Sequence, residues 1–170
     1  MNIFYLDSNP NLAAQYHLDK HVIKMILESA QLLCTSHRVI SNNIFNQNIL
    51  YKSTHINHPC SIWCRSSINN YMWLYDLFVA LCDEYMFRYD KVHKTDSLFR
   101  HMLKSPPSGI LKINFTNPPQ AMPEKYKCKD SVLAYRNYYI GEKYKFASWK
   151  KRNVPSWFKL SNTGENHANI

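Results

Sequence analysis

Glycine, acidic residues and long apolar runs are all scarce in this chain of 170 residues. Three glycines are too few for a many-turned β architecture or for a glycine-rich phosphate loop. No apolar run approaches the ~20 residues that a membrane-spanning helix needs. The first residues also lack the basic and apolar regions of a signal peptide. The sequence therefore predicts an intracellular, cytoplasmic protein without a membrane partner.

A disulfide framework and the common cofactor motifs are missing as well. The five cysteines are an odd number without paired CxxC motifs, which favours free thiols in a reducing compartment. We expect Cys60 and Cys64 to be small core residues. No P-loop, Rossmann fingerprint, GxSxG elbow or kinase motif is present, and we expect no cofactor.

Apolar and aromatic residues in helical spacing dominate what is present. Hydrophobic residues make up 45% of the chain and aromatic residues 14%, which suits one folded domain. The spacing predicts a mainly α fold, a single-domain helical bundle over residues 1–160, with a flexible tail at 161–170. A short extended segment at 1–6 and an irregular, proline-rich loop at 105–123 complete the prediction.

Turn formers and prolines set the expected helix boundaries. Asp7-Ser-Asn-Pro10 predicts a first helix that starts near Pro10 and runs towards His37, with a possible break near residues 17–19. Further elements are a loop at 41–57, a long and therefore bent helix at 59–89, helices at 96–103 and 130–149, and a turn at 155–158.

Four polar residues in the first helical region form a narrow stripe. His17, His21, Lys24 and Glu28 are spaced at i, i+4, i+7 and i+11, with apolar residues on both sides. A thin polar stripe between apolar flanks is typical of a helix that faces a cleft. Imidazole, amine and carboxylate groups can act there as acid, base or nucleophile, so we expect a catalytic role.

Two other interpretations of the stripe are open. It can be a solvated face with an ordinary Lys24–Glu28 ion pair. The two histidines also have metal-ligand spacing, and His55 with His58 would complete four ligands. The glutamate of an H-E-x-x-H motif is missing, however, and nearby lysines repel a cation. We therefore predict no metal site.

Positive charge is concentrated late in the chain. Lys and Arg number 21 against 12 acids, a formal net charge of +9. Residues 125–159 hold ten of these bases and only two acids, interleaved with nine aromatic residues. Bases neutralise phosphates and aromatic rings stack on unpaired nucleobases, so this mixture favours DNA as a partner. The alternative is a basic surface over an aromatic core.

Further polar residues lie at predicted loop–helix boundaries and in the basic region. Such boundaries often carry binding residues. The expected substrate-binding residues are His55, Asn57, His58, Arg65, Lys94, Gln120, Tyr135, Arg136 and Tyr139.

Several segments together resemble a family of phage-encoded proteins: MNIFYLDSNP, LDKHVIKM, INHPCSIW, NYMWLYDLFVALCDEY, QAMPEKY and AYRNYY. The resemblance covers most of the chain, to Phe158. More distantly, the plan is similar to the endonuclease V type of pyrimidine-dimer DNA glycosylase. Those proteins are small, basic and all-helical, with an N-terminal amine nucleophile and a glutamate on an early helix. Leu12-Ala-Ala-Gln15 followed by His17 resembles their first helix.

The chain departs from that pattern at both catalytic positions. Asn2 follows Met1, and its size disfavours removal of the initiator methionine, whereas the family's amine belongs to a small second residue. Lys24 lies near the position of the family's glutamate, and Glu28 is one turn further on. If the chemistry is retained, a buried Lys24 could supply the amine and Glu28 the carboxylate. The sequence leaves open whether the N-terminal amine takes part.

These patterns lead to three hypotheses on function. The first is a DNA-acting enzyme of the host-cell cytoplasm, a base-excision glycosylase or lyase for damaged or modified pyrimidines. The second is a phosphohydrolase or transferase for free nucleotides, and the third is a non-catalytic nucleic-acid-binding protein. The oligomeric state is left open.

Overall fold

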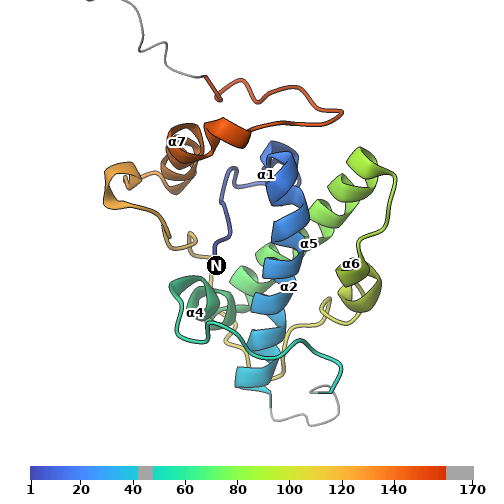
Figure 1. The fold of residues 1–170 in the computed structure, drawn as a ribbon. Coiled ribbons are helices and arrows are strands. Elements are labelled where there is room, and N and C mark those ends of the chain that lie inside the picture. Colours follow the sequence, from blue (N-terminus) through green and yellow to red (C-terminus); the bar gives the residue numbers. More distant parts are fainter. Residues whose placement is uncertain (42–47, 160–170) are drawn as a thin grey trace, which may run out of the picture.

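The computed structural model describes residues 1–41 and 48–159. Within these residues the fold is all-helical, with six α-helices packed in a single domain and no strand (Figure 1). The predicted mainly α, single-domain class is confirmed. In the described residues, no helix has the length and apolar content that crossing a bilayer requires. The predicted tail at 161–170 and residues 42–47 of the predicted loop lie outside the described residues.

The first predicted helix is two helices, α1 (Pro10–Tyr16) and α2 (Asp19–Ile40). The Asn9 side chain accepts hydrogen bonds from two backbone N–H groups in the first turn of α1, and Pro10 follows it as predicted. His17 and Leu18 have extended backbone between the two helices. The expected break is therefore confirmed, and it places His17 outside the helix that carries the rest of the stripe.

The long helix expected at 59–89 is also divided, into α4 (Pro59–Ser66) and α5 (Ile68–Tyr89). Ser67 between them has φ −152° and ψ 143°, an extended conformation. Its hydroxyl accepts from the N–H of Asn69 and donates to the carbonyl of Ile113, 2.7 Å away. The expected bend is a full break, because the proline-rich loop supplies a partner for the hydroxyl that caps α5.

The later helices are shorter than the sequence indicates. The observed elements are α6 (Lys94–Phe99), a 3-10 turn η1 (Glu124–Tyr126), α7 (Ser131–Lys143) and a 3-10 turn η2 (Tyr144–Phe146). Asp130 caps α7 as predicted, with its side chain accepting from the N–H of Leu133. The helix ends at Lys143 rather than near Trp149, because the chain forms the 3-10 turn η2 there. After η2, Trp149 donates to the Tyr16 carbonyl and the N–H of Lys150 donates to Asp19. The loop at 105–123 contains no helix or strand, and the turn at 155–158 is present.

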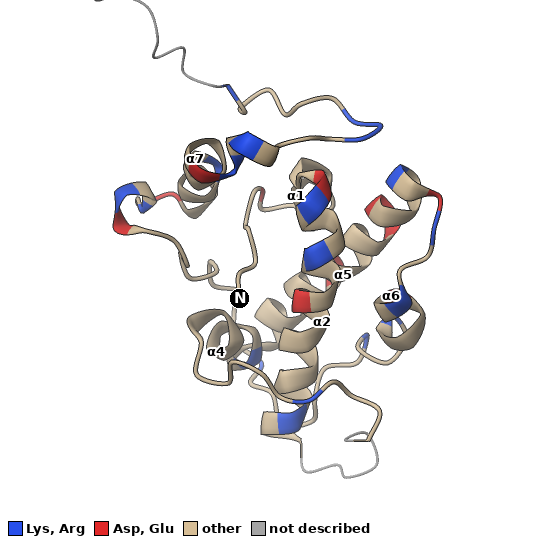
Figure 2. Ribbon diagram, viewed as in Figure 1, with Lys and Arg blue, Asp and Glu red and all other residues tan. Residues whose placement is uncertain are grey.

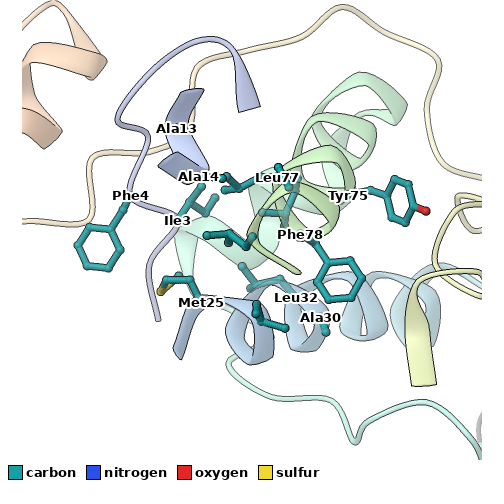
Figure 3. Close-up of a cluster of buried hydrophobic side chains, with 14 of the residues drawn as sticks. Ile3, Phe4, Ala13, Ala14, Met25, Ala30, Leu32, Tyr75, Leu77 and Phe78 are labelled. Atoms are coloured by element: carbon teal, nitrogen blue, oxygen red, sulfur yellow. The ribbon is translucent and has the colours of Figure 1, made fainter. Parts of the chain in front are cut away.

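The core lies between α2 and α5, with α1, α4 and α6 packed around this pair. Met25, Ile26, Leu74, Leu77 and Phe78 have no exposed surface. Figure 3 shows Met25, Leu77 and Phe78 in this core, with the small residues Ala13 and Ala14 on α1, which packs against α5. Small side chains at these positions permit close helix packing.

The extended segment at the amino terminus forms no strand. Residues 3–6 are buried, and Phe4 has a positive φ of 55°, which interrupts a regular extended conformation. Figure 3 shows Ile3 directed to the core and the ring of Phe4 directed away from it. A positive φ at a bulky residue costs free energy. Neighbouring contacts must therefore hold the segment in place.

A buried charge network connects α2 and α5 to the chain after η2. The guanidinium of Arg88 has no exposed surface and donates to Glu84 Oε1 at 2.7 Å, Asp19 Oδ1 at 2.9 Å and the Gln15 carbonyl at 3.0 Å. Arg152 donates to both carboxylate oxygens of Glu84. Such pairing is what makes buried charges tolerable. Arg152 therefore stabilises the fold by pairing with Glu84.

Candidate active site

The two histidines of the polar stripe lie inside an aromatic cluster. His17, at the end of α1, has no exposed surface, and its Nδ1 donates to the Ala13 carbonyl at 2.7 Å. His21, in the first turn of α2, is 7% exposed and its ring stacks on Phe4 with centroids 4.3 Å apart. Burial lowers the pKa of His17 to about 4. Burial, followed by the nearby positive charges, lowers the pKa of His21 to about 3. Both rings are therefore neutral near pH 7.

Tyr139 holds His21 from the side of α7. Its hydroxyl and Nδ1 of His21 form a hydrogen bond of 2.6 Å, and the tyrosine has no exposed surface. Phe4 lies between His21 and Tyr138, with its ring nearly parallel to both. The histidines thus help to fix the amino-terminal segment between α2 and α7. Neither histidine is a charged group of an open site.

Lys24 is on the surface, contrary to the expectation that a catalytic amine at this position is buried. Its side chain is 66% exposed, and its Nζ lies 3.1 Å from Glu28 Oε1. The Lys24 amine therefore lies in solvent rather than in a buried pocket. The ordinary i,i+4 ion pair, which was the alternative interpretation of the stripe, is present.

Glu28 lies beside the amino terminus. Its side chain is only 12% exposed, and its Oε2 accepts a hydrogen bond of 3.1 Å from the backbone N–H of Asn2. The Asn2 side chain donates to the carbonyl of Ala121 at 2.8 Å, which attaches the same residue to the proline-rich loop. The carboxylate is thus held next to the first residue of the chain. Figure 1 shows the amino terminus beside α4, in front of the proline-rich loop.

His58 and Cys60 complete this group from the start of α4. Burial, then the charge of the amino-terminal amine, lowers the pKa of His58, whereas Glu28 acts in the opposite direction. The same two charges act on Cys60, where burial raises the pKa of the thiol to about 12. Cys60 is therefore a neutral thiol and no nucleophile near pH 7. We call Met1, Glu28 and His58 the amino-terminal site.

The other residues expected to bind substrate at the start of α4 have mixed positions. His55 and Asn57 are exposed, and His55 has a positive φ of 48°. His58 caps α4 by accepting from the N–H of Cys60. Arg65 donates to the Ile56 carbonyl at 2.8 Å and so braces the turn that carries these residues. This turn belongs with the amino-terminal site.

Lys94 is not brought to that site. It is the exposed first residue of α6, which packs on α2. Figure 1 shows α6 on the opposite side of α2 from α4 and the amino terminus.

The expected substrate-binding residues of the proline-rich loop and α7 support the fold. Gln120 bonds the backbone N–H and carbonyl of Cys128 and so closes the loop between them. Arg136 donates to the Leu6 carbonyl at 2.9 Å and to Asp7 at 3.0 Å, which fastens the amino-terminal segment to α7. These contacts hold the proline-rich loop and the amino-terminal segment in place, although neither Gln120 nor Arg136 belongs to the amino-terminal site.

Tyr135 and Tyr139 are core residues, which corrects the expectation that they stack on nucleobases. Neither has any exposed surface. The Tyr135 hydroxyl donates to the Pro119 carbonyl at 2.7 Å, and Tyr139 bonds His21. A base could not reach either ring in this arrangement, because both faces are covered by protein.

The sequence left the role of the N-terminal amine open and gave no signal for Phe4. Nothing in the segment MNIFYL indicates that Glu28 accepts a hydrogen bond from Asn2. The positive φ of Phe4 has no sequence signal, because such a conformation is rare for a phenylalanine. The spacing of the stripe did indicate that Lys24 and Glu28 lie side by side, and they form an ion pair.

Metal ligands do not gather anywhere in the described part of the chain. Across residues 1–41 and 48–159, no three His, Cys, Asp or Glu side chains are placed to hold one ion. His17 and His21 are buried against Phe4, and His55 and His58 lie next to each other at the start of α4.

No family model matches the sequence, and neither does any curated protein or solved structure that was compared with it.

Proposed function

We propose that the protein is a DNA base-excision glycosylase with lyase activity, and that the α-amine of Met1 is its nucleophile. The observation that carries this proposal is the hydrogen bond from Asn2 N–H to Glu28 Oε2, which holds a largely buried carboxylate one residue from the amine. An amine and a carboxylate side by side are the two groups that imine-forming catalysis needs.

The α-amine suits the reaction better than the Lys24 side chain. As a class, α-amines are weaker bases than lysine side chains by about 2.5 pH units, so more of them carry a free electron pair near pH 7. The ammonium of Lys24 is solvated and paired with Glu28 instead. In this proposal Lys24 is not the nucleophile, and its ion pair helps to hold the Glu28 carboxylate in place.

The reaction proceeds by attack of the amine nitrogen on C1′ of the deoxyribose. The glycosidic bond breaks, and the base leaves with the bonding electron pair and takes up a proton. The sugar ring opens to an imine between the amine and C1′. Glu28 then removes a proton from C2′, and the phosphate at C3′ leaves by β-elimination. Water hydrolyses the imine and returns the free amine.

Positive charge near the site supports DNA as the substrate. Lys24 and Lys143 both act on His21, and Lys20 lies over the ring of Phe146 in the same region. Figure 2 shows further Lys and Arg residues along η2 and the chain after it, at the end of the molecule that holds the first turns of α2. Such a surface attracts a phosphate backbone towards the amino-terminal site.

Borohydride trapping tests the proposal. The intact protein is first weighed by mass spectrometry to verify that Met1 is the first residue with a free amine. It is then incubated with an oligonucleotide that contains an abasic site, and borohydride reduces any imine to a stable adduct. We expect the DNA on the peptide that contains Met1. An adduct on Lys24, or no adduct at all, contradicts the assignment.

Two variants separate the roles of the neighbouring groups. Lys24→Met should still form the adduct, because its amine is not the nucleophile. Glu28→Gln keeps an oxygen that accepts from Asn2 but cannot act as a base, so strand cleavage should fall by about 10²-fold or more. Glu124→Gln removes a carboxylate that is 87% exposed and serves as the matched control. Steeply salt-dependent DNA binding without any adduct would instead support a non-catalytic nucleic-acid-binding protein.

A further inference from the structure

Five aromatic rings form a continuous row from η1, across the amino-terminal segment, to η2. In order they are Tyr126, Tyr138, Phe4, His21 and Phe146, and the centroids of neighbouring rings are 5.5, 6.2, 4.3 and 6.1 Å apart. Phe4 and His21 in the middle are buried, whereas the other three rings are partly exposed. This aromatic row therefore reaches the surface on both sides of its buried middle.

Lysines from two helices lie over the partly exposed rings. Nζ of Lys143 on α7 is 4.7 Å from the centre of the Tyr138 ring, and Nζ of Lys20 on α2 is 5.1 Å from the centre of the Phe146 ring. Neither ammonium has an acidic partner among the residues that the structure describes. The charge of Lys143 also acts on His21, in the middle of the row. Positive charge without a partner therefore lies along the aromatic row, where it favours an anion.

An unpaired nucleotide presents the two groups that this surface lacks. Its phosphate is an ionic partner for an ammonium, and its base has free faces that stack on an aromatic ring. A lysine over an exposed ring is held less strongly than a stacked base, so a base can take the place of the ammonium. The displaced ammonium then pairs with the phosphate of the same strand.

The Tyr126 end of the row is already occupied by contacts within the protein. The Tyr126 hydroxyl donates to Glu142 at 2.9 Å, and Lys125 pairs with the same carboxylate at 3.0 Å. The ring also lies so close to Gly141 that a Cβ there would clash with it. This end therefore braces the row, and the part from Tyr138 to Phe146 is the part that can bind a strand.

We propose that this surface binds an unpaired DNA strand, with bases stacked on Tyr138 and Phe146 and with phosphates bound by Lys143 and Lys20. Bases inside a duplex are covered on both faces by their neighbours, so an intact duplex offers phosphates to the lysines but no base to the rings. The proposal replaces the core residues Tyr135 and Tyr139 with partly exposed rings as the stacking groups.

The bound strand lies next to the amino-terminal site. Phe4, in the middle of the row, is two residues from Asn2, whose N–H donates to Glu28. The substrate of that site is then a nucleotide in an unpaired or opened segment of DNA. This assignment of the substrate, and the choice of DNA over RNA, rest on the proposed function, whereas strand binding by the aromatic row does not.

Fluorescence anisotropy of the full chain with three labelled oligonucleotides tests the proposal. They are a short thymine strand, the same strand annealed to its complement, and a strand of equal length in which a tetrahydrofuran analogue replaces the nucleosides. The analogue has no base and cannot form an imine. The thymine strand should bind at least about fivefold more tightly than the other two, because stacking one base corresponds to about 5- to 150-fold in affinity. Equal or tighter binding of the duplex or of the strand without bases overturns the proposal.

Substitutions separate stacking from charge. Tyr138→Leu should remove the advantage of the thymine strand over the strand without bases, whereas Tyr138→Phe keeps the ring and should retain it. Lys143→Gln should weaken the binding of both strands alike, because it removes a phosphate contact. Tyr85→Leu changes a partly buried tyrosine on α5 and is the matched control. The thermal midpoint verifies that each variant is folded.

An unchanged advantage of the thymine strand in folded Tyr138→Leu overturns the proposal. If Tyr138→Leu does not fold, Lys143→Gln decides, and unchanged affinity for both strands then has the same consequence. Strand binding is measured without any reaction. A missing adduct in the trapping experiment therefore leaves it unaffected, and equal affinity for strand and duplex leaves the trapping result unaffected.

Discussion

The two histidines between α2 and α7 are examples of titratable groups that the fold keeps neutral. His17 is fully enclosed, and His21 is held by Phe4 on one face and Tyr139 at its edge. Protonating either ring in the folded state would place an uncompensated charge inside the aromatic cluster. Their contribution is therefore to anchor the amino-terminal segment, on which the position of Met1 depends.

This arrangement predicts a loss of stability in mild acid. In the unfolded chain a histidine takes up a proton near pH 6.5, whereas the folded pKa is about 4 for His17 and about 3 for His21. The unfolded state therefore binds more protons below pH 6.5, and each ring lowers the unfolding free energy by up to about 1.4 kcal/mol per pH unit as the pH falls. Above pH 7 neither ring contributes to the slope. Urea unfolding at pH 7.5, 6 and 5 measures how the unfolding free energy changes with pH.

The variant His21→Gln isolates one of the two contributions. The amide can still bond the Tyr139 hydroxyl but does not titrate, so the slope between pH 6 and pH 5 should shrink by about 1.4 kcal/mol per pH unit. His101→Gln removes an exposed imidazole and is the matched control. Equal slopes in wild type and His21→Gln would show that His21 is protonated in the folded state.

At the scale of elements, α7 depends on one glycine for its contact with η1. A Cβ at Gly141 would lie 2.2 Å from the Tyr126 hydroxyl oxygen, so a larger residue must displace that ring. Tyr126 donates to Glu142 at 2.9 Å and packs on Tyr138. The ring fixes the loop before α7 against the helix, and the preceding residue Ala121 accepts a hydrogen bond from Asn2.

Gly141→Ala should therefore destabilise the protein by about 1–3 kcal/mol through overpacking. Alanine by itself favours a helix over glycine by about 1 kcal/mol, so the sign is the opposite of the intrinsic preference. In a Tyr126→Ala background the clash is absent, and the same change should stabilise by about 1 kcal/mol. Urea unfolding of the four proteins forms a double-mutant cycle. Stabilisation by Gly141→Ala in both backgrounds would show that Tyr126 does not pack there.

For the whole molecule, ion pairing determines which of the many Lys and Arg side chains are available to bind the phosphates of a nucleic acid. Lys151 lies 2.8 Å from Asp90, and Arg152 is bound to Glu84. Lys20 and Lys143 have no acidic partner in the described residues and lie over the rings of Phe146 and Tyr138. These two lysines therefore border the aromatic cluster that contains Phe4 and His21.

If DNA binds across this surface, the salt dependence of binding should reside in these residues. Replacing Lys20 and Lys143 with Gln should reduce the slope of log affinity against log salt by about 1.8, since each phosphate contact contributes about 0.9. The double change Lys125→Gln and Lys151→Gln removes the same charge from bases that are already paired, and should leave the slope nearly unchanged. Fluorescence anisotropy of a labelled duplex at several salt concentrations measures both slopes. Equal reductions would place the phosphate contacts elsewhere.

The sequence by itself determined the features that depend on neighbouring residues. The all-helical class follows from apolar spacing, and the starts of α1, α4 and α7 follow from Asn9, Pro59 and Asp130. The break near His17 and the irregular proline-rich loop were also predictable. These signals are local, because a cap or a proline acts within one helical turn whatever the rest of the chain does.

Only the tertiary structure decided which distant groups meet. Glu28 accepts from the N–H of Asn2 and pairs with an exposed Lys24. Tyr135 and Tyr139 lie in the core rather than on a binding surface. Arg152 is taken up by Glu84. An aromatic or charged residue can have the same helical spacing in the sequence whether it is buried in the core or exposed on a binding surface. Its environment depends on which other element packs against that face, and this is fixed by burial and pairing across the whole molecule.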